Sequence, residues 1–252
     1  MEPILEEYMQ NFGQKYGPEM QETFLNCHAS VCTIEILGEE PWYWFELKTP
    51  GYPPKNFVGT YCLNGGNWIN KQDKNPLDVY RREISEEVKD ARIVSQLLVN
   101  AKAAGDYFSH VPKEVHGNPR QNDYNFVFSL VETNIDRYEL AYKLGLENDF
   151  SAESLSRALG GVQQYPAAIV TLQQFKDGLE RQICWGYDQI MSEYLERKHG
   201  FHPRIRMFEG IVVKKLESSP FTPFEERETL NHYRINPLRE ATDDKKLFSV
   251  PS

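Results

Sequence analysis

The sequence predicts a mixed α/β (α+β) domain. Segments rich in β-branched and aromatic residues alternate with segments whose apolar residues recur every three or four positions, and clusters of glycine and proline separate them. The 252 residues, 40% of them hydrophobic and 26% charged, are enough to build a sizeable core. This alternation favours a sheet covered by helices over a helical bundle or a β-sandwich.

The first half of the chain alternates predicted strands with one well-marked helix. In order, the expected elements are a helix over residues 3–24, hairpin strands over 27–37 and 42–47, a loop over 49–55, a short strand over 57–63 that runs into Gly65-Gly66, a helix over 77–89 and a strand over 93–100. The helix over 77–89 has the clearest beginning. Asn75 is a good N-cap, Pro76 suits the first helical position, and Asp78 places a carboxylate where the helix dipole favours it.

The second half continues the alternation and ends in a polar stretch. The expected elements are a strand over 124–131, a helix over 137–159 ended by Gly160-Gly161, a strand over 167–172, a helix over 173–199 and a strand over 205–213. After residue 216 apolar residues become sparse. We therefore expect an extended tail that wraps the domain or a second subunit of a homodimer.

These elements divide the chain into three parts. We expect an N-terminal helical extension over residues 1–25, a central domain over 26–200, and a C-terminal strand and tail over 201–252. No apolar run approaches the roughly 18 residues of a membrane span, and the first residues lack the basic and apolar regions of a signal peptide. The expectation is a cytoplasmic chain with no membrane partner.

Charge and cysteine usage narrow the classes of partner. Lys and Arg number 28 against 37 Asp and Glu, a net charge of −9, so the overall field does not attract duplex nucleic acid and any bound phosphate needs a local device. The four cysteines (Cys27, Cys32, Cys62 and Cys184) include no CxxC pair. We expect reduced and mostly buried thiols and no zinc site.

The segment from Arg82 to Glu87 carries the most chemical information. On a helix, Glu83, Glu86 and Glu87 stand at positions i, i+3 and i+4, so their carboxylates converge on one face. Such close like charges repel, and a hard divalent cation reverses the sign of that interaction. Arg82 reaches Glu86 at i+4 and can fix its rotamer. The alternative is a solvated helix face with ordinary surface ion pairs.

These residues, with Gly65-Gly66 upstream, resemble the Nudix box. That family pattern runs glycine, five residues, Glu, seven residues, then Arg-Glu-aliphatic-x-Glu-Glu-x-Gly-aliphatic, and its second half is present from Arg82 to Glu87. The resemblance implies a Nudix-like mixed β-sheet sandwiched between helices. It also implies Mg²⁺-assisted hydrolysis, with Mn²⁺ as a possible substitute, of the pyrophosphate bond in a nucleotide such as ADP-ribose, NAD or a dinucleoside polyphosphate.

The resemblance also implies roles for individual residues. Glu83, Glu86 and Glu87 would hold the metal together with the carbonyl of Gly65, and Arg82 would orient Glu86. The flanks depart from the family. Lys74 stands where the family has Glu, which leaves the number of metal ions open although its cation can itself reach a phosphate.

Further departures follow the helix and keep a second hypothesis open. Lys89 and Asp90 replace the family's glycine and aliphatic residue, and the glycine loop is two residues longer than usual. These changes suit a Nudix-like module that has lost hydrolysis and instead senses a nucleotide or scaffolds a partner. A domain with a purely structural role is the third reading.

Several residues outside the helix are candidates for substrate contact. These candidates are Gly66, Trp68, Lys74, Tyr107 and Arg120. Trp68, within the glycine loop, is the best candidate to stack on a base. Trp42, Trp44 and Phe45 could also do so, but aromatic residues in strands are more often part of the core. Arg120 can form a phosphate clamp with Lys113 and His116, although basic residues in a polar loop also serve solubility.

Two assignments depend on the resemblance. Tyr107 lies 17 residues past Asp90, an offset similar to that of a tyrosine in the dinucleoside polyphosphate hydrolases of the family. Many members take their general base from outside the box, and Glu132, at a predicted strand end, is the candidate here. A solvated strand-end acid is the alternative for Glu132.

Overall fold

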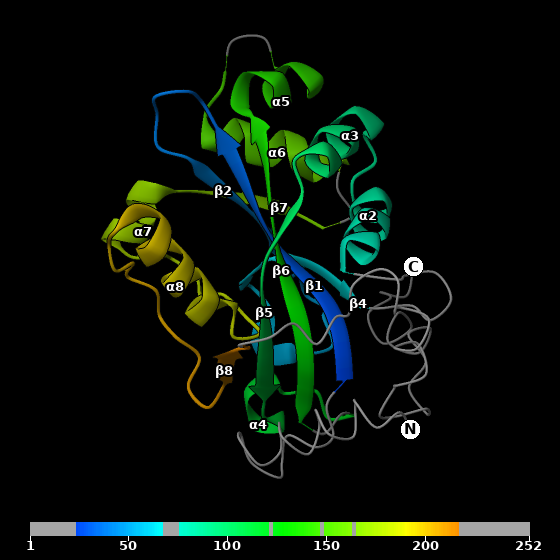
Figure 1. Ribbon diagram of the computed structural model, residues 1–252, viewed down its shortest axis with the longest axis vertical. Coiled ribbons are helices and arrows are strands. Elements are labelled where there is room, and N and C mark those ends of the chain that lie inside the picture. Colours follow the sequence, from blue (N-terminus) through cyan, green and yellow to red (C-terminus); the bar gives the residue numbers. More distant parts are fainter. Residues whose placement is uncertain (1–23, 68–75, 121–122, 147–148, 163–164, 217–252) are drawn as a thin grey trace.

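The computed structural model describes residues 24–67, 76–120, 123–146, 149–162 and 165–216 (Figure 1). Within these ranges an eight-stranded mixed sheet has helices on both faces, so the predicted α/β class is confirmed. The helix expected over 3–24 and the tail after residue 216 lie outside the described residues.

The sheet contains both parallel and antiparallel pairs. Its strands are β1 (Phe24–Glu35), β2 (Trp42–Leu47), β3 (Tyr61–Cys62), β4 (Asn64–Asn67), β5 (Lys102–Val111), β6 (Tyr124–Asp136), β7 (Ala167–Thr171) and β8 (Val212–Lys215). Their order is β3-β2-β1-β6-β5-β8, with β4 paired to β1 and β7 to β2. The central β1–β6 pair is parallel and β1–β2 forms the predicted hairpin, with Cys32 opposite Trp44.

Helices cover both faces of this sheet. They are the 3₁₀ helix η2 (Lys55–Phe57) and the α-helices α2 (Pro76–Glu87), α3 (Ala91–Val99), α4 (Lys113–His116), α5 (Arg137–Lys143), α6 (Ala152–Val162), α7 (Leu172–Asp177) and α8 (Tyr187–His199). In Figure 1, α2 and α3 lie on one side of the central strands and α7 and α8 on the other. None of the helices in the described ranges has the length and hydrophobicity of a membrane span.

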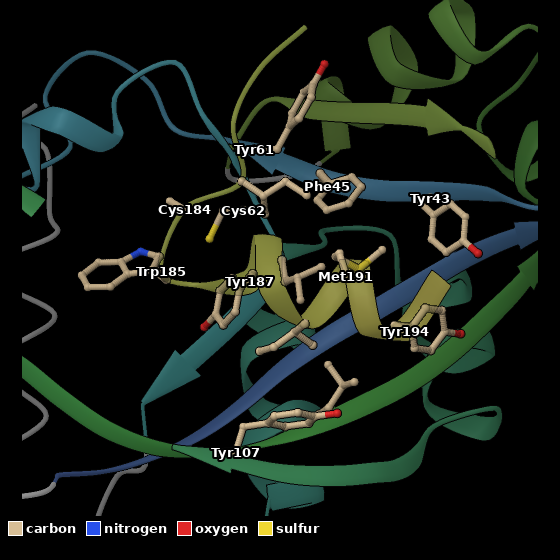
Figure 2. Close-up of a cluster of buried hydrophobic side chains, with 14 of the residues drawn as sticks. Tyr43, Phe45, Tyr61, Cys62, Tyr107, Cys184, Trp185, Tyr187, Met191 and Tyr194 are labelled. Atoms are coloured by element: carbon tan, nitrogen blue, oxygen red, sulfur yellow. The ribbon is translucent and has the colours of Figure 1, made fainter. Parts of the chain in front are cut away.

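Two apolar clusters hold the layers together, one on each face. The cluster under α7 and α8 is rich in aromatic residues and includes Tyr43, Phe45, Tyr107 and Tyr194 (Figure 2). The cluster under α2, α3, α5 and α6 includes Trp44. Successive side chains of a strand point to opposite faces, so β2 sends Tyr43 and Phe45 to one cluster and Trp44 to the other. By the same alternation, Glu46 lies on the α2 face.

The strand predicted over 93–100 is wrong, because this segment is the helix α3. Asp90 caps it, with its Oδ1 accepting the backbone N–H groups of Arg92 and Ile93 at 2.9 and 3.4 Å. The hydrogen bonds from Arg92 lower the pKa of Asp90 to about 2. The β-branched Ile93 and Val94 favour a strand by composition, but the helix buries both of them with Leu97 on one face. The strand that sequence reasoning missed is β5, whose register shifts between Ala103 and Gly105.

Two predicted long helices are each divided. Residues 137–159 form α5 and α6, separated at Gly145 (φ 73°), and residues 173–199 form α7 and α8. Between α7 and α8, Gly178 (φ 122°) and Gly186 (φ 82°) break the helix, and Ile183 forms a parallel bridge with Tyr61. Gly186 has no space for a Cβ, which would overlap Val213 Cγ2. Apolar spacing alone does not reveal these breaks, because apolar residues recur at three and four positions on both sides of each break.

The strand expected over 205–213 is shorter and later in the structure. Only Val212–Lys215 forms β8, which pairs with β5, while Ile205 and Phe208 pack on the cluster under α8. The segment is fixed by Asp188, a fully buried residue in the first turn of α8. Its Oδ2 accepts from Phe208 N at 2.6 Å and its Oδ1 from Gln189 N at 2.8 Å. Residues 201–216 therefore share the core of the sheet that precedes them.

Asp188→Asn is expected to change how stability depends on pH. Burial raises the pKa of Asp188 to about 6, although its two backbone hydrogen bonds oppose the shift. Between pH 4 and 6 the folded chain therefore holds a proton that the unfolded chain has lost, so the free energy of unfolding falls as pH rises, by up to about 3 kcal/mol. Urea unfolding at pH 4 and 6 should show a smaller fall for Asp188→Asn. Asp177→Asn is the control, because Asp177 is exposed on α7. If the free energy of unfolding fell equally in the wild type and in both variants, the raised pKa of Asp188 would be contradicted.

Candidate functional site

The helix α2 holds the three predicted glutamates on one side and packs through the other. Its apolar residues Val79, Tyr80 and Ile84 are buried, and the helix contacts β1 and β4. Glu83 and Glu87 are almost fully buried, whereas the side chain of Glu86 is 43% exposed. The helix therefore presents two acids inward and one at the rim.

The residues predicted as a glycine turn form the strand β4 in the structure, and this strand lies directly against α2. Gly66, in β4, stands opposite His28 of β1. A Cβ on Gly66 would overlap Cγ and Cδ of Glu83 and lie 2.6 Å from its Oε1. Only glycine leaves room for that carboxylate. The structure thus brings together Gly66 and Glu83, which are 17 positions apart in the sequence.

Arg82 contacts two of the three glutamates. Its Nη1 forms a short ion pair with Glu83 Oε1 and lies 3.7 Å from Glu86 Oε1. The sequence predicted the contact with Glu86 at i+4, and the structure adds the contact with Glu83. One guanidinium therefore limits the rotamers of both carboxylates.

Sequence reasoning missed a second buried charge pair, which comes from the sheet. Glu46, near the end of β2, is 1% exposed, and its Oε2 accepts a hydrogen bond from Lys48 Nζ at 2.7 Å. Lys48 lies over the rings of Tyr52 and Tyr165, with Nζ 4.9 and 5.0 Å from their centroids. Two charges flanking Leu47 at the end of an aromatic-rich strand were the available signal for this pair.

Glu87 is the acid with the least compensation. Burial raises its pKa well above the usual range for a glutamate, repulsion from Glu46 and Glu83 raises it further, and Lys48 offsets a part. Among the described residues Glu87 forms no ion pair, and Glu46 Oε1 is a buried atom without a hydrogen-bond partner. Ionised together, these carboxyl groups would place an excess of negative charge away from water, and the raised pKa of Glu87 reflects that cost.

This donor set suits a hard divalent cation, although the side chains are not already arranged around one. Within the described ranges no three His, Cys, Asp or Glu side chains are gathered closely enough to enclose a metal ion. Glu83 is paired with Arg82 and Glu46 with Lys48, and the side chain of Glu86 is partly exposed to solvent. Mg²⁺ prefers oxygen ligands such as carboxylates. One carboxylate oxygen here, Glu46 Oε1, is buried without a hydrogen-bond partner among the described residues, so the residues fit this ion by their chemistry.

The remaining substrate-contact candidates have different locations. Trp68 and Lys74 lie outside the described residues, and Gly65 pairs with Ala29 in the sheet. Tyr107 does not join the glutamates, because it is buried on the α8 face and stacks on Phe128 (Figure 2). Burial there raises its pKa to about 12.

The proposed phosphate clamp is divided between surface and core. Arg120 and Lys113 are exposed, and the backbone N–H of Arg120 donates to Asn118 Oδ1. His116 is fully buried, its Nδ1 accepts from Asn118 N at 3.0 Å, and its ring packs on Tyr124. His116 therefore stabilises the turn after α4 and is not available to a ligand.

Glu132, the general-base candidate, does not lie with the glutamates of α2. Its carboxylate lies 3.3 Å from Lys102 Nζ and 3.8 Å from Arg197 Nη2, on the face covered by α8 and opposite to α2. Trp44 and Phe45 are core residues, as their alternative reading held. Trp42 lies under the guanidinium of Arg137, 3.5 Å from its ring centroid.

The cysteines described by the structure are free, as predicted. Cys32, Cys62 and Cys184 are all buried, and the side chain of Cys27 lies outside the described part of the chain. Burial raises the pKa of the Cys32 and Cys62 thiols far above their usual value. These thiols are structural and unreactive by that criterion.

Comparison with known proteins gives Nudix structures. No family model matches the sequence, and the search of curated proteins found no match. The chain is similar to the NUDIX domain of Shewanella oneidensis NrtR complexed with ADP-ribose, at 12% identity and a TM-score of 0.40, over 75% of this chain and 97% of that domain. It is also similar to a mutT/nudix family protein from Listeria innocua, at 11% identity and a TM-score of 0.34, over 69% of this chain and 96% of that one.

A third similar structure is the Nudix hydrolase RenU from M. smegmatis. The identity is 9% and the TM-score 0.31, over 58% of this chain and 70% of that one. All three structures are from the family whose box residues 65–90 resemble. The chemistry has to be argued from the residues of the site.

Gly66→Ala is expected to destabilise the protein through its contact with Glu83. The new Cβ would overlap the glutamate side chain, so either β4 or α2 must move, at a cost of about 1–3 kcal/mol. Urea unfolding measures this cost. Gly161→Ala is the control, because a Cβ there meets nothing within 4 Å and lies in α6, where alanine is preferred. A Gly66→Ala protein as stable as the wild type would show that Glu83 does not lie on this glycine.

Proposed function

We propose that the chain is a Mg²⁺-dependent Nudix-type hydrolase. Its substrate class is a nucleoside diphosphate linked to another group, such as ADP-ribose, NAD or a dinucleoside polyphosphate, and it cleaves the pyrophosphate bond. The observation that carries the proposal is the charge imbalance beside Gly66. Within the part of the chain that the structure describes, four acidic side chains (Glu46, Glu83, Glu86 and Glu87) lie near two cations (Arg82 and Lys48), and Glu87 is buried without an ion pair. A divalent cation compensates that excess.

The residues of α2 would hold the ion from one side. Glu83 and Glu87 are the buried donors, and Glu86 stands at the rim where a substrate phosphate arrives. The carbonyl of Gly65, in the adjoining strand, is a further donor within the Nudix resemblance. When bound, Mg²⁺ supplies polarisation of the pyrophosphate, a more acidic water and neutralisation of the leaving phosphate.

The surrounding residues would fix the geometry. Arg82 restricts Glu83 and Glu86, so that these side chains lose little further freedom on binding the ion. Val79, Tyr80 and Ile84 anchor the helix in the core. Positioning by a rigid helix keeps the reacting groups in place, as phosphoryl chemistry requires.

A nucleotide sensor without hydrolysis is the second candidate. The departures of Lys89 and Asp90 from the family pattern motivate it, although in the structure Asp90 caps α3 and the backbone N–H of Lys89 donates to Val162 O at 2.7 Å. These two residues thus connect the end of the box to α3 and α6. A sensor would bind a nucleotide tightly and leave its phosphate bonds intact.

The test is hydrolysis of a substrate panel with and without Mg²⁺. The panel contains ADP-ribose, NAD, dinucleoside polyphosphates and nucleotide sugars. We expect Mg²⁺-dependent release of a mononucleotide from at least one of them. Glu86→Gln and Glu87→Gln should each lower the rate at least about 100-fold, because charge stabilisation by the ion is worth several kcal/mol.

Glu153→Gln provides the matched control for that experiment. Glu153 is an exposed helical glutamate that pairs with Arg157 at i+4, far in sequence from the box. It should retain the wild-type rate. Unchanged activity in both Glu86→Gln and Glu87→Gln would remove α2 from the mechanism, and tight binding without cleavage would favour the sensor.

A further inference from the structure

Glu46 is an unusual residue for the middle of a sheet. It stands opposite Cys62 of β3 on one side and Ala167 of β7 on the other, and it is 1% exposed. Strand positions flanked on both sides favour apolar and β-branched residues, and a buried carboxylate is costly unless each of its oxygens is compensated. An explanation is therefore needed for a charge at this position.

Lys48 compensates only one of the two oxygens. Its Nζ donates to Oε2 at 2.7 Å, while Oε1 has no hydrogen-bond partner among the described residues. The ammonium also lies over the rings of Tyr52 and Tyr165, and these cation–π contacts favour its present position. The arrangement fixes Glu46 by one oxygen and leaves the other for another partner.

Glu46 lies on the α2 face of the sheet. Glu46 follows Trp44 by two positions and so shares its face of the sheet, where Trp44 packs in one cluster with Tyr80 and Ile84. Repulsion from Glu46 raises the pKa of Glu87 more than that from any other charged group, and a side-chain contact between the two acids raises it further. Glu46 and Glu87, which are about 40 residues apart in the sequence, thus place two buried carboxyl groups near one another.

We propose that Glu46 is a further acidic ligand of the cation held by α2, with Lys48 as the positioning residue that fixes its second oxygen. This inference rests on the proposed function. A cation between Glu46 and Glu87 gives Oε1 the partner it lacks and replaces the repulsion between the two acids by two attractions. It also ties β2 to α2, so that the ligand set is drawn from outside the box as well as from within it.

The experiment measures Mn²⁺ binding, with the loss of the free Mn²⁺ signal in electron paramagnetic resonance as the readout. The full chain is compared with Glu46→Gln, Glu87→Gln and Glu132→Gln. Glu46→Gln should weaken Mn²⁺ binding about tenfold or more, and the rise in Tm produced by Mg²⁺ should shrink in parallel. Glu132→Gln is the matched control, because Glu132 is also a sheet glutamate paired with a lysine but on the opposite face. It should bind Mn²⁺ as the wild type does.

A double variant keeps the test valid if Glu46→Gln folds poorly. Removing one charge leaves Lys48 buried without its partner, whereas Glu46→Gln with Lys48→Met removes both charges, and such replacements commonly preserve the fold. Urea unfolding without metal identifies which variant is folded. The double variant should retain the wild-type fold and show the same tenfold or greater loss of Mn²⁺ affinity.

The outcomes separate this inference from the proposed function. Loss of Mn²⁺ binding in Glu87→Gln with wild-type affinity in folded Glu46→Gln, or in the double variant, overturns the role of Glu46 and leaves the α2 site standing. A wild-type chain that binds no Mn²⁺ overturns both. Weakened binding in both Glu46→Gln and Glu87→Gln, with Glu132→Gln unchanged, supports a ligand set that includes β2.

Discussion

Repulsion among buried carboxylates is the constraint on which the α2 face of this protein depends. Glu83 and Glu87 are carried inward by a helix that is anchored through Tyr80 and Ile84, and Glu46 meets them from the sheet. Removing acids from water is unfavourable, and bringing them together adds to the cost. Arg82 and Lys48 reduce that cost without cancelling it. A cation bound among these acids would remove part of this cost and so stabilise the folded protein.

The two faces of the sheet differ in what they contribute. The α8 face is an aromatic core that includes Tyr43, Tyr107 and Tyr194 (Figure 2). The α2 face combines an apolar cluster with the charged residues near the ends of β2 and β4. One face therefore supplies rigidity, and the other supplies the polar groups. The parallel β1–β6 pair at the centre joins the two.

Features with a local cause could be predicted from the sequence. The helix α2 has its cap, its proline and its carboxylate stripe within a few residues, and the contact between Gly66 and Glu83 follows from a recognisable motif. The segment after Asp90 was misread because β-branched residues outweighed a good N-cap. Glu46 and Lys48 were missed for a different reason, since their meaning depends on which face of β2 packs on α2. That relation is fixed by long-range pairing and has no local signature.

The two departures at the end of the box, Lys89 and Asp90, have separate structural roles. Lys89 acts through its backbone N–H, which bonds to Val162 at the end of α6, and Asp90 caps α3. Both therefore secure helices packed behind α2, and neither side chain is needed for the carboxylates to face inward. Replacement of a glycine and an aliphatic residue at these positions is thus explained by packing, and it does not by itself indicate a loss of hydrolysis. The burial of Glu46 and Glu87 side by side fits the proposed cation site, because a protein that needs no cation gains nothing from keeping two acids together away from water.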